Sequence, residues 1–326
     1  MAKKKLKVVV TDLGYASYEP EKEILAEVGA EMVLARCSTQ AEVGKACADA
    51  DGVITRLAPV GAEAIAKMRK CRVISRYGVG VDNVDVAAAT KRGIPVANVR
   101  DYCNEDVSDH ALGLLLACAR RVSSRDRQVR AGKWDIGAKE PIHRIAGKVL
   151  GLIGYGAIAR TLHRKVSGFG LAEVLAHDAF IPPEQIEQGG ARPVGMAELL
   201  ARSDFISLHV PLTESTRHLI GTEQLKAMKP TAILVNTSRG GVVDADALYH
   251  ALKEGRIASA ALDVHEVEPP PKDYKLFELD NVILTDHAGW YSEESQLALQ
   301  RTTARNVALV LGGGRPLFCV NPEVLK

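Results

Sequence analysis

Short apolar runs alternate with amphipathic stretches along the chain. In the first hundred residues the apolar runs predict five strands, at 6–11, 31–35, 52–55, 72–75 and 94–98. Apolar residues at helical spacing between them predict helices at 21–28, 40–48, 63–68 and 84–91. Strands that alternate with helices predict a parallel sheet with helices on both faces. We expect this first α/β unit to end near residue 103.

The rest of the chain repeats this alternation after a long helix. That helix is predicted at 105–121, further helical residues at 125–132, and a loop at 134–143. Six more strands are predicted, at 149–153, 174–178, 204–209, 231–236, 258–262 and 281–285. Shorter helices are expected at 196–202, 222–228 and 244–254, and the Pro-Pro and Gly-Gly pairs of 182–190 predict a loop. A final helix at 293–311 is expected to cross back to the first unit, which makes that unit discontinuous.

A glycine turn follows the predicted strand 149–153 and leads directly into a helical pattern, Gly154-Tyr155-Gly156-Ala157-Ile158-Ala159. The first glycine allows a tight turn, and the second lets the backbone approach a pyrophosphate at the helix N-terminus. Ala159 is an accepted third residue of this dinucleotide-binding pattern. Asp178 ends the next apolar run, where an acid accepts the ribose hydroxyls of NAD and repels the 2′-phosphate of NADP. The alternatives are an NADP site and an ordinary turn without a ligand.

Composition excludes several classes of protein. The chain has 326 residues, of which 47% are hydrophobic and 25% charged, with a formal net charge of +2. This balance is typical of a globular protein of two domains, and gives no sign of a nucleic-acid or membrane partner. The Lys3-Lys4-Lys5 run is expected to be a solvated terminus, and neither a signal peptide nor a membrane helix is expected. The six scattered cysteines and nine dispersed histidines favour reduced thiols, a cytoplasmic protein and no metal site.

A second glycine loop, Gly78-Val79-Gly80, follows the predicted strand 72–75 and Arg76-Tyr77. Ligands of open α/β sheets gather beyond the carboxyl ends of the strands, and two glycines let backbone amides point at an anion. Arg56 ends the neighbouring strand, so Arg56 and Arg76 are candidate cationic partners. The alternative is a plain turn with two solvated arginines.

Three polar residues follow later strands: Arg239, Glu268 and His287. Loops at one edge of a sheet share a space, so we expect these side chains to converge. Arginine binds a carboxylate in a fork and polarises an adjacent carbonyl. Histidine moves a proton near neutral pH, and a glutamate beside it favours the imidazolium. Each residue alone has a bland interpretation as a solvated loop side chain, but together with the cofactor turn they predict hydride transfer in a cleft between two domains.

These motifs stand in one order along nearly the whole chain, and here the sequence resembles the D-isomer-specific 2-hydroxyacid dehydrogenase family, which includes D-3-phosphoglycerate dehydrogenases. It is most like the C-terminal-binding-protein-like branch. The resemblance rests on segments 76–85, 101–110, 154–156, 209–213, 236–241, 262–264, 268–269 and 287–292. It implies a homodimer that binds NAD, with a Rossmann domain at 104–291 inserted into a discontinuous, flavodoxin-like substrate domain at 1–103 and 292–326. The implied activity interconverts a small 2-keto acid and its D-2-hydroxy acid.

The resemblance also implies roles for single residues. Arg239 anchors the substrate, His287 is the acid/base and Glu268 its partner, while Asp263 holds the nicotinamide carboxamide. The other residues implied at the cofactor are Gly154, Tyr155, Gly156, Ala157, Ile158, Asp178, Val210, Pro211, Thr213, Thr216, Thr237, Ser238 and Gly289, with His287 beside them. Those implied at the substrate are Arg56, Arg76, Tyr77, Gly78, Val79, Gly80 and Trp290.

The sequence departs from the family at several positions without losing a catalytic group. Asp286 stands where proline often precedes the catalytic histidine, Arg100 where proline is common, and His265 where an apolar residue is usual. An NAD-responsive corepressor on the same fold is the alternative function, because such corepressors keep the Arg, Glu and His set.

Overall fold

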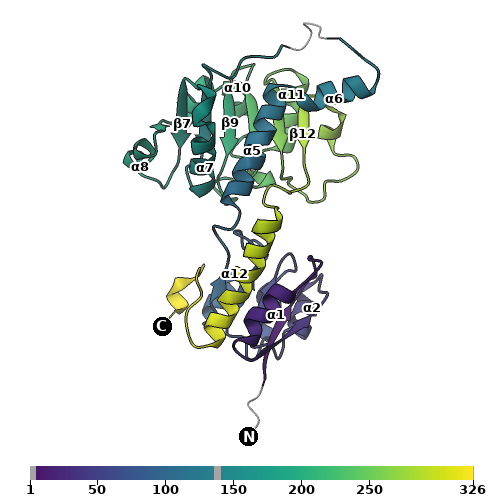
Figure 1. The fold of residues 1–326 in the computed structure, drawn as a ribbon, viewed down its shortest axis with the longest axis vertical. Helices are drawn as coiled ribbons and strands as arrows, with labels where there is room; N and C mark the ends of the chain where they lie inside the picture. Colours follow the sequence, from purple (N-terminus) through teal and green to yellow (C-terminus); the bar gives the residue numbers. More distant parts are fainter. Residues whose placement is uncertain (1–4, 136–140, 326) are drawn as a thin grey trace. The chain divides into compact units, whose positions relative to one another are not determined.

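The computed structural model describes residues 5–135 and 141–325. The chain divides into two compact units, one made of residues up to 103 together with those from 292 on, the other of residues 104–291 (Figure 1). Each unit holds a parallel sheet, which confirms the predicted α/β class with two doubly wound sheets. Lys3, Lys4 and positions 136–140 of the expected loop lie outside the described residues.

The first unit is built on five parallel strands in the order β2-β1-β3-β4-β5. The strands are β1 (Leu6–Val10), β2 (Ala30–Leu34), β3 (Gly52–Thr55), β4 (Ile74–Arg76) and β5 (Val96–Ala97). The helices between them are α1 (Glu19–Ala26), α2 (Gln40–Ala46), α3 (Ala62–Lys67) and α4 (Val86–Lys91). Val8, Val9 and Val10 are almost fully buried, as expected for a strand covered on both faces.

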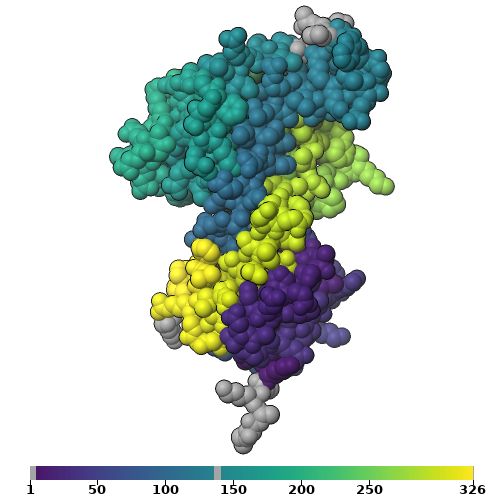
Figure 2. All heavy atoms as spheres, viewed as in Figure 1, coloured from purple at the N-terminus to yellow at the C-terminus, as the bar shows by residue number. Residues whose placement is uncertain are grey.

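Helix α12 (Glu293–Leu311) completes the first unit and packs against α1, β3 and β4. Figure 2 shows the N-terminal and C-terminal segments in contact within this unit. A capping box at Ser292 starts the helix. Both terminal guanidinium nitrogens of Arg72 donate to carbonyls of its last turn, where a cation also complements the helix dipole. The fold therefore ties a segment from the end of the chain to strands from its beginning.

The second unit holds seven parallel strands in the order β12-β11-β10-β9-β6-β7-β8. They are β6 (Val149–Ile153), β7 (Glu173–His177), β8 (Arg192–Pro193), β9 (Phe205–Leu208), β10 (Ile233–Asn236), β11 (Ser259–Leu262) and β12 (Val282–Leu284). Its helices are α5 (Asn104–Ala119), α6 (Val122–Arg130), α7 (Ala157–Lys165), α8 (Pro183–Gln188), α9 (Met196–Arg202), α10 (Thr222–Ala227) and α11 (Ala245–Lys253). The order reverses between β9 and β6, and this switch point is where open α/β sheets bind ligands.

Both faces of this sheet are buried, which explains why its strands are continuous apolar runs. Val235 and Ala261 pack into a core with residues of α5 and α7. Leu234 and Ala260 point to the other face and pack with residues of α9, α10 and α11. Because side chains alternate between the two faces of a strand, neighbouring residues pack into two different cores.

The structure corrects the prediction at several element boundaries. The segment expected to be a loop at 182–190 contains α8, and β8 follows as a seventh strand where six were expected. β8 is a two-residue edge strand that contains Pro193, and proline is tolerated in a sheet chiefly at its edge. Helix α6 begins three residues earlier than the expected 125, directly after Arg121 in a left-handed conformation. Among the described residues, no helix has the length and apolar character needed to cross a lipid bilayer.

Candidate active site

The glycine turn joins β6 to α7 at the switch point of the second unit. Gly154 has a φ of +87°, and a Cβ there would lie 2.6 Å from the backbone oxygen of His209. Gly156 is the N-cap of α7 and makes no side-chain cap. In the described part of the chain, no neighbouring atom lies within 4 Å of the position that its Cβ would take. The first turn of α7 therefore opens onto free space without a side-chain cap, which suits a pyrophosphate.

Asp178 directly follows β7 and is bound to this turn. Its Oδ2 accepts the N–H of Tyr155 at 2.8 Å, and its Oδ1 accepts those of Phe180 and Ile181 at 2.8 and 3.0 Å. Partial burial raises the pKa of Asp178, but the three N–H donors outweigh that effect and hold it below its ordinary value. An ionised carboxylate accepts about four hydrogen bonds, so it keeps acceptor capacity for a ribose hydroxyl.

The loop after β9 folds back on itself through Thr216. Its hydroxyl donates to the carbonyl oxygen of Pro211 at 2.6 Å and accepts the N–H of Thr213 at 2.7 Å. At the end of β10, the hydroxyl of Thr237 is buried and has no hydrogen-bond partner among the described residues, whereas Ser238 is bound to Asn236. A buried hydroxyl without a partner is costly, so Thr237 fits a role in holding a polar group of a bound cofactor.

Asp263 follows β11 and organises the next loop. Only 2% of it is exposed, and it accepts the Thr285 hydroxyl at 2.6 Å and the N–H groups of Ala288 and Gly289 at 3.0 and 2.9 Å. His110 Nε2 from α5 lies 3.1 Å from the same carboxylate. Burial raises the pKa of Asp263, but the His110 and Thr285 contacts, with the Gly289 N–H, bring it below its ordinary value. That Asp263 also binds the nicotinamide carboxamide stays a prediction.

His287 and Glu268 form a pair at the same edge of the sheet. His287 Nδ1 lies 2.8 Å from Glu268 Oε2, with 41% and 38% of the two side chains exposed. The other Glu268 oxygen accepts the N–H of His265 at 3.0 Å. Partial burial raises the pKa of Glu268, but the bonds from His287 and the His265 N–H lower it below its ordinary value. The backbone of His287 is left-handed, with a φ of 57°, and its N–H donates to Asp263 O at 2.8 Å.

Arg239 lies three residues past the end of β10. Its carbonyl oxygen accepts the amide N–H of Asn236 at 2.9 Å, and its Nη1 donates to the carbonyl of Ser238 at 2.8 Å. The half-buried guanidinium is thus held by its own turn. Trp290 is also half-buried, with its ring edge-on to Tyr291 at 5.6 Å between centroids.

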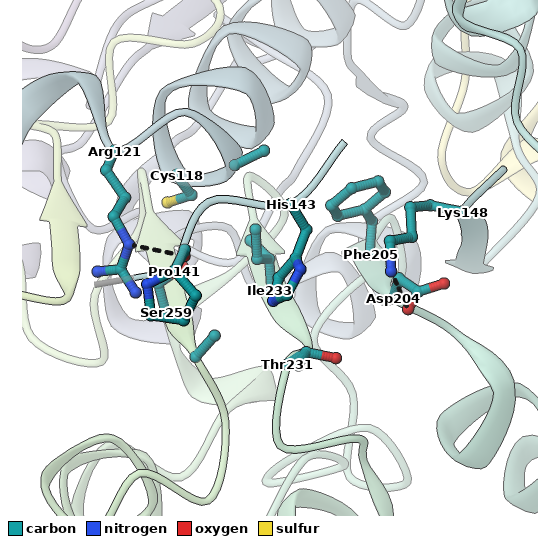
Figure 3. Close-up of a pocket in the computed structure, with 12 residues that line it drawn as sticks. Cys118, Arg121, Pro141, His143, Lys148, Asp204, Phe205, Thr231, Ile233 and Ser259 are labelled. Carbon is teal, nitrogen blue, oxygen red and sulfur yellow. Dashed lines mark hydrogen bonds and ion pairs between the residues drawn. The ribbon is translucent and has the colours of Figure 1, made fainter. Parts of the chain in front are cut away.

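The second unit also has a pocket at the opposite, amino-terminal edge of the sheet (Figure 3). It spans about 440 Å³, open solvent included, and its lining includes Cys118, Phe205 and Ile233. Lys148 and Asp204 pair at 3.6 Å at its rim. The residues of the candidate site follow their strands, apart from His110 of α5. Those of this pocket lie at the first residue of β9, β10 or β11 or just before a strand, or come from the end of α5, the residue just before α6 and the 141–148 segment. This pocket is therefore separate from the candidate site.

The first unit carries the other glycine loop, which follows β4. The carbonyl oxygen of Gly78 accepts the N–H of Val99 at 3.0 Å, and that of Val79 accepts the amide N–H of Asn98 at 2.7 Å. These bonds fix the backbone of the Gly78–Gly80 loop. Tyr77 is buried, and its hydroxyl donates to the buried Glu21 at 2.6 Å. Its side chain is therefore committed to the core of the unit.

The two arginines predicted beside this loop have defined neighbours. The Arg56 guanidinium lies 5.8 Å from the centre of the Tyr15 ring, a distance typical of a cation–π contact. A Cβ on Gly78 would lie 2.0 Å from Arg76 Nη1, so Arg76 folds back under the loop. Tyr15 was not predicted, and within residues 5–135 and 141–325 its buried hydroxyl has no hydrogen-bond partner.

Sequence reasoning missed the residues that support the site. His110 and Thr285 hold Asp263, and His218 pairs with Glu266 beside Glu268. Each lies far from its partner in the sequence, and only the closure of the sheet brings them together. The one local signal was the position of Thr285 and His218, one and ten residues past a strand end, which many solvated residues share; His110 lies within α5.

Comparison with known proteins gives the family. Residues 112–289 match the model described as "D-isomer specific 2-hydroxyacid dehydrogenase, NAD binding domain". The chain is 45% identical to a glyoxylate reductase of Korarchaeum cryptofilum, over 85% of each protein. It is 44% identical to a D-3-phosphoglycerate dehydrogenase of Methanocaldococcus jannaschii, over 94% of this chain and 58% of that protein. The crystal structure of a glyoxylate reductase from Paecilomyes thermophila superposes with a TM-score of 0.87 at 29% identity, over 98% of this chain and 99% of that one.

These matches agree with the geometry of the second unit. The glycine turn, the open helix N-terminus and the acid after β7 are the parts that a dinucleotide site needs. They lie within the residues that match the NAD-binding model. The chain is therefore an NAD-dependent oxidoreductase and belongs to the D-isomer-specific 2-hydroxyacid dehydrogenase family.

Proposed function

We propose that the protein interconverts a small 2-keto acid and its D-2-hydroxy acid, with His287 as the acid/base, Glu268 as its partner and Arg239 as the substrate anchor. The observation that carries this proposal is the 2.8 Å contact of His287 Nδ1 with Glu268. A carboxylate at one ring nitrogen orients the imidazole and leaves Nε2 to exchange a proton with the substrate. Because the pKa of Glu268 is lowered, its carboxylate is ionised at neutral pH and favours the imidazolium.

The chemistry divides between the cofactor and the side chains. NAD, when bound, supplies or accepts the hydride at C2 of the substrate. Arg239 binds the substrate carboxylate and polarises the adjacent carbonyl. In the reduction, His287 donates a proton to the carbonyl oxygen, and Glu268 stabilises the imidazolium before the transfer. In the oxidation, neutral His287 takes the hydroxyl proton. Gly154, Gly156, Asp178 and Thr237 would hold the cofactor, as their geometry allows.

The side chain of the substrate is the open part of this proposal. One relative is named for glyoxylate and another for D-3-phosphoglycerate. We propose that the amides of Val79 and Gly80 bind the substrate carboxylate. Arg76 lies against this loop and Arg56 against the Tyr15 ring in the same unit, and two guanidinium groups favour a substrate with a second anionic group.

A spectrophotometric panel with NADH tests both parts of the proposal. Glyoxylate, pyruvate, hydroxypyruvate, phenylpyruvate and 3-phosphohydroxypyruvate are compared by kcat/KM, and we expect the phosphorylated acid to exceed hydroxypyruvate. With the best substrate, His287→Ala should lower kcat about 100-fold or more, because proton transfer acts in the transition state. His250→Ala, which removes an exposed histidine on α11, is the control. Near wild-type turnover by His287→Ala would refute the mechanism, and a preference for hydroxypyruvate would refute the anionic side chain.

A further inference from the structure

His218 lies in the loop between β9 and α10 with a left-handed backbone, at a φ of 50°. Residues other than glycine rarely adopt this conformation, because the Cβ crowds the backbone. A histidine kept there must make contacts that offset the strain. The contacts of His218 reach the two loops that carry Arg239 and Glu268.

The backbone of His218 is joined to the turn that follows Arg239. Its N–H donates to the carbonyl oxygen of Gly241 at 2.8 Å, and the N–H of Ile220 donates to that of Val242 at 3.0 Å. The N–H of Asp244 returns a bond to the carbonyl of Ile220 at 3.0 Å. Three backbone bonds thus fix the loop of His218 against the residues directly after Arg239.

The side chain of His218 reaches the other loop. Its Nε2 lies 2.5 Å from Glu266 Oε1, and its Nδ1 lies 4.0 Å from Asp244 Oδ2. Glu266 stands two residues before Glu268, and the intervening backbone is held by the bond from His265 N–H to Glu268. The imidazole therefore connects the Arg239 turn to the segment that orients His287.

The two loops are also packed directly against each other. A Cβ on Gly240 would lie 1.9 Å from the carbonyl carbon of His265 and 2.4 Å from the nitrogen of Glu266. The residue after Arg239 thus touches the backbone that leads to Glu268. Close packing of this kind fixes the two loops only while another contact holds them together. The His218–Glu266 pair supplies such a contact.

We propose that His218 is a positioning residue, which keeps Arg239 in register with the Glu268–His287 pair. The inference rests on the proposed function, because the roles of those three residues come from it. His218 need not touch the substrate: it acts by holding Glu266. A small misplacement of catalytic groups lowers the rate about 100-fold in well-studied cases, so loss of one supporting contact should lower kcat about tenfold.

The test compares four variants and one control variant on the best keto acid. His218→Gly removes the imidazole and relieves the backbone strain, so it should fold well and lose about tenfold in kcat while its KM for NADH stays near wild type. Glu266→Ala should lose as much, and the double variant no more than either single one, because both changes break the same pair. His218→Gln should recover most of the activity, since its amide nitrogen can donate to Glu266. Arg121→Gly relieves a left-handed backbone of similar φ, 52°, and should leave kcat unchanged.

The outcomes separate this inference from the proposed function. Wild-type kcat in His218→Gly, or additive losses in the double variant, would overturn the positioning role while the His287→Ala result still stands. The positioning role would also be overturned if His218→Gly lost thermal stability and His218→Gln did not recover kcat, because these results together would indicate a structural role only. Turnover by His287→Ala would instead remove the proposed function itself.

Discussion

Two glycines of the cofactor turn, two residues apart, should respond in opposite ways to alanine. Gly154→Ala should destabilise the second unit, whereas Gly156→Ala should preserve its fold and weaken NAD binding. Gly154 has a φ of +87°, and its added Cβ would lie 2.6 Å from the backbone oxygen of His209. Backbone cannot rotate away as a flexible side chain can, so the clash must move β9 or the turn.

Two costs add at Gly154. A non-glycine residue in a sparsely populated backbone region costs about 1–3 kcal/mol, and an extra methyl group in a packed site costs about 1–3 kcal/mol more. We expect the free energy of unfolding to fall by about 4 kcal/mol. In a domain of 150–250 residues each kcal/mol lowers Tm by about 2–4 °C, so Tm should fall by about 8–16 °C.

The Gly156 substitution should have little such cost. Its φ is −71°, which any residue adopts, and no neighbouring atom of the residues described lies within 4 Å of the new Cβ. Alanine is a poorer N-cap than glycine, which costs about 1 kcal/mol or less. The methyl group would instead occupy the open space at the start of α7 where we place the pyrophosphate. Keeping the phosphates one methyl group away should raise Kd for NADH at least about tenfold, or 1.4 kcal/mol.

Circular dichroism melts without cofactor give Tm for both variants, and fluorescence titration with NADH gives Kd. We expect a crossed pattern: Tm falls more in Gly154→Ala, and Kd rises more for each degree of lost Tm in Gly156→Ala. A Gly154→Ala protein that melts with the wild type would refute the packing argument. A Gly156→Ala protein that binds NADH as tightly as the wild type would refute the placement of the pyrophosphate.

Two further predictions concern charge. Asp178→Ala removes the acid that repels a 2′-phosphate, so the KM ratio of NADPH to NADH should fall about tenfold or more; an unchanged ratio would show that Asp178 does not select the cofactor. Glu268→Gln removes a carboxylate whose pKa is lowered, so that it is ionised at neutral pH. The amide can still contact Nδ1 of His287 but carries no charge to stabilise the proton that this ring transfers, so kcat for keto-acid reduction should fall about tenfold or more. An unchanged kcat would contradict the pairing.

The sequence was most informative where one local pattern decides the structure. The apolar run before Gly154 is followed by a glycine turn and a helix, which favours a buried strand. Helix α12 ends where expected, at Leu311. By contrast, β8 has only two residues, one of them Pro193. It carries no periodicity, and the structure forms it because β7 leaves an unpaired edge.

The candidate site could be predicted residue by residue but not as a network. Arg239, Glu268 and His287 were recognised by their types and by their places after strands. The contacts that hold them depend on packing between loops that are distant in sequence, such as Gly240 against His265. No sequence pattern predicts that Tyr77 contacts Glu21 in the core, because a tyrosine beside a glycine loop can equally lie on a surface.

The proposed proton-transfer residues and the cofactor turn all lie in residues 104–291, whereas the Gly78–Gly80 loop and its two arginines lie in the other unit. This separation has an evolutionary consequence. If the Gly78–Gly80 loop binds the substrate, as we propose, substitutions in the first unit alter which keto acid is accepted while the residues for hydride and proton transfer are inherited unchanged. Relatives of nearly equal identity, 45% and 44%, are named for different substrates. On this argument, overall similarity is a poor guide to the substrate of any one descendant, and the few residues around the first unit's loop are a better one.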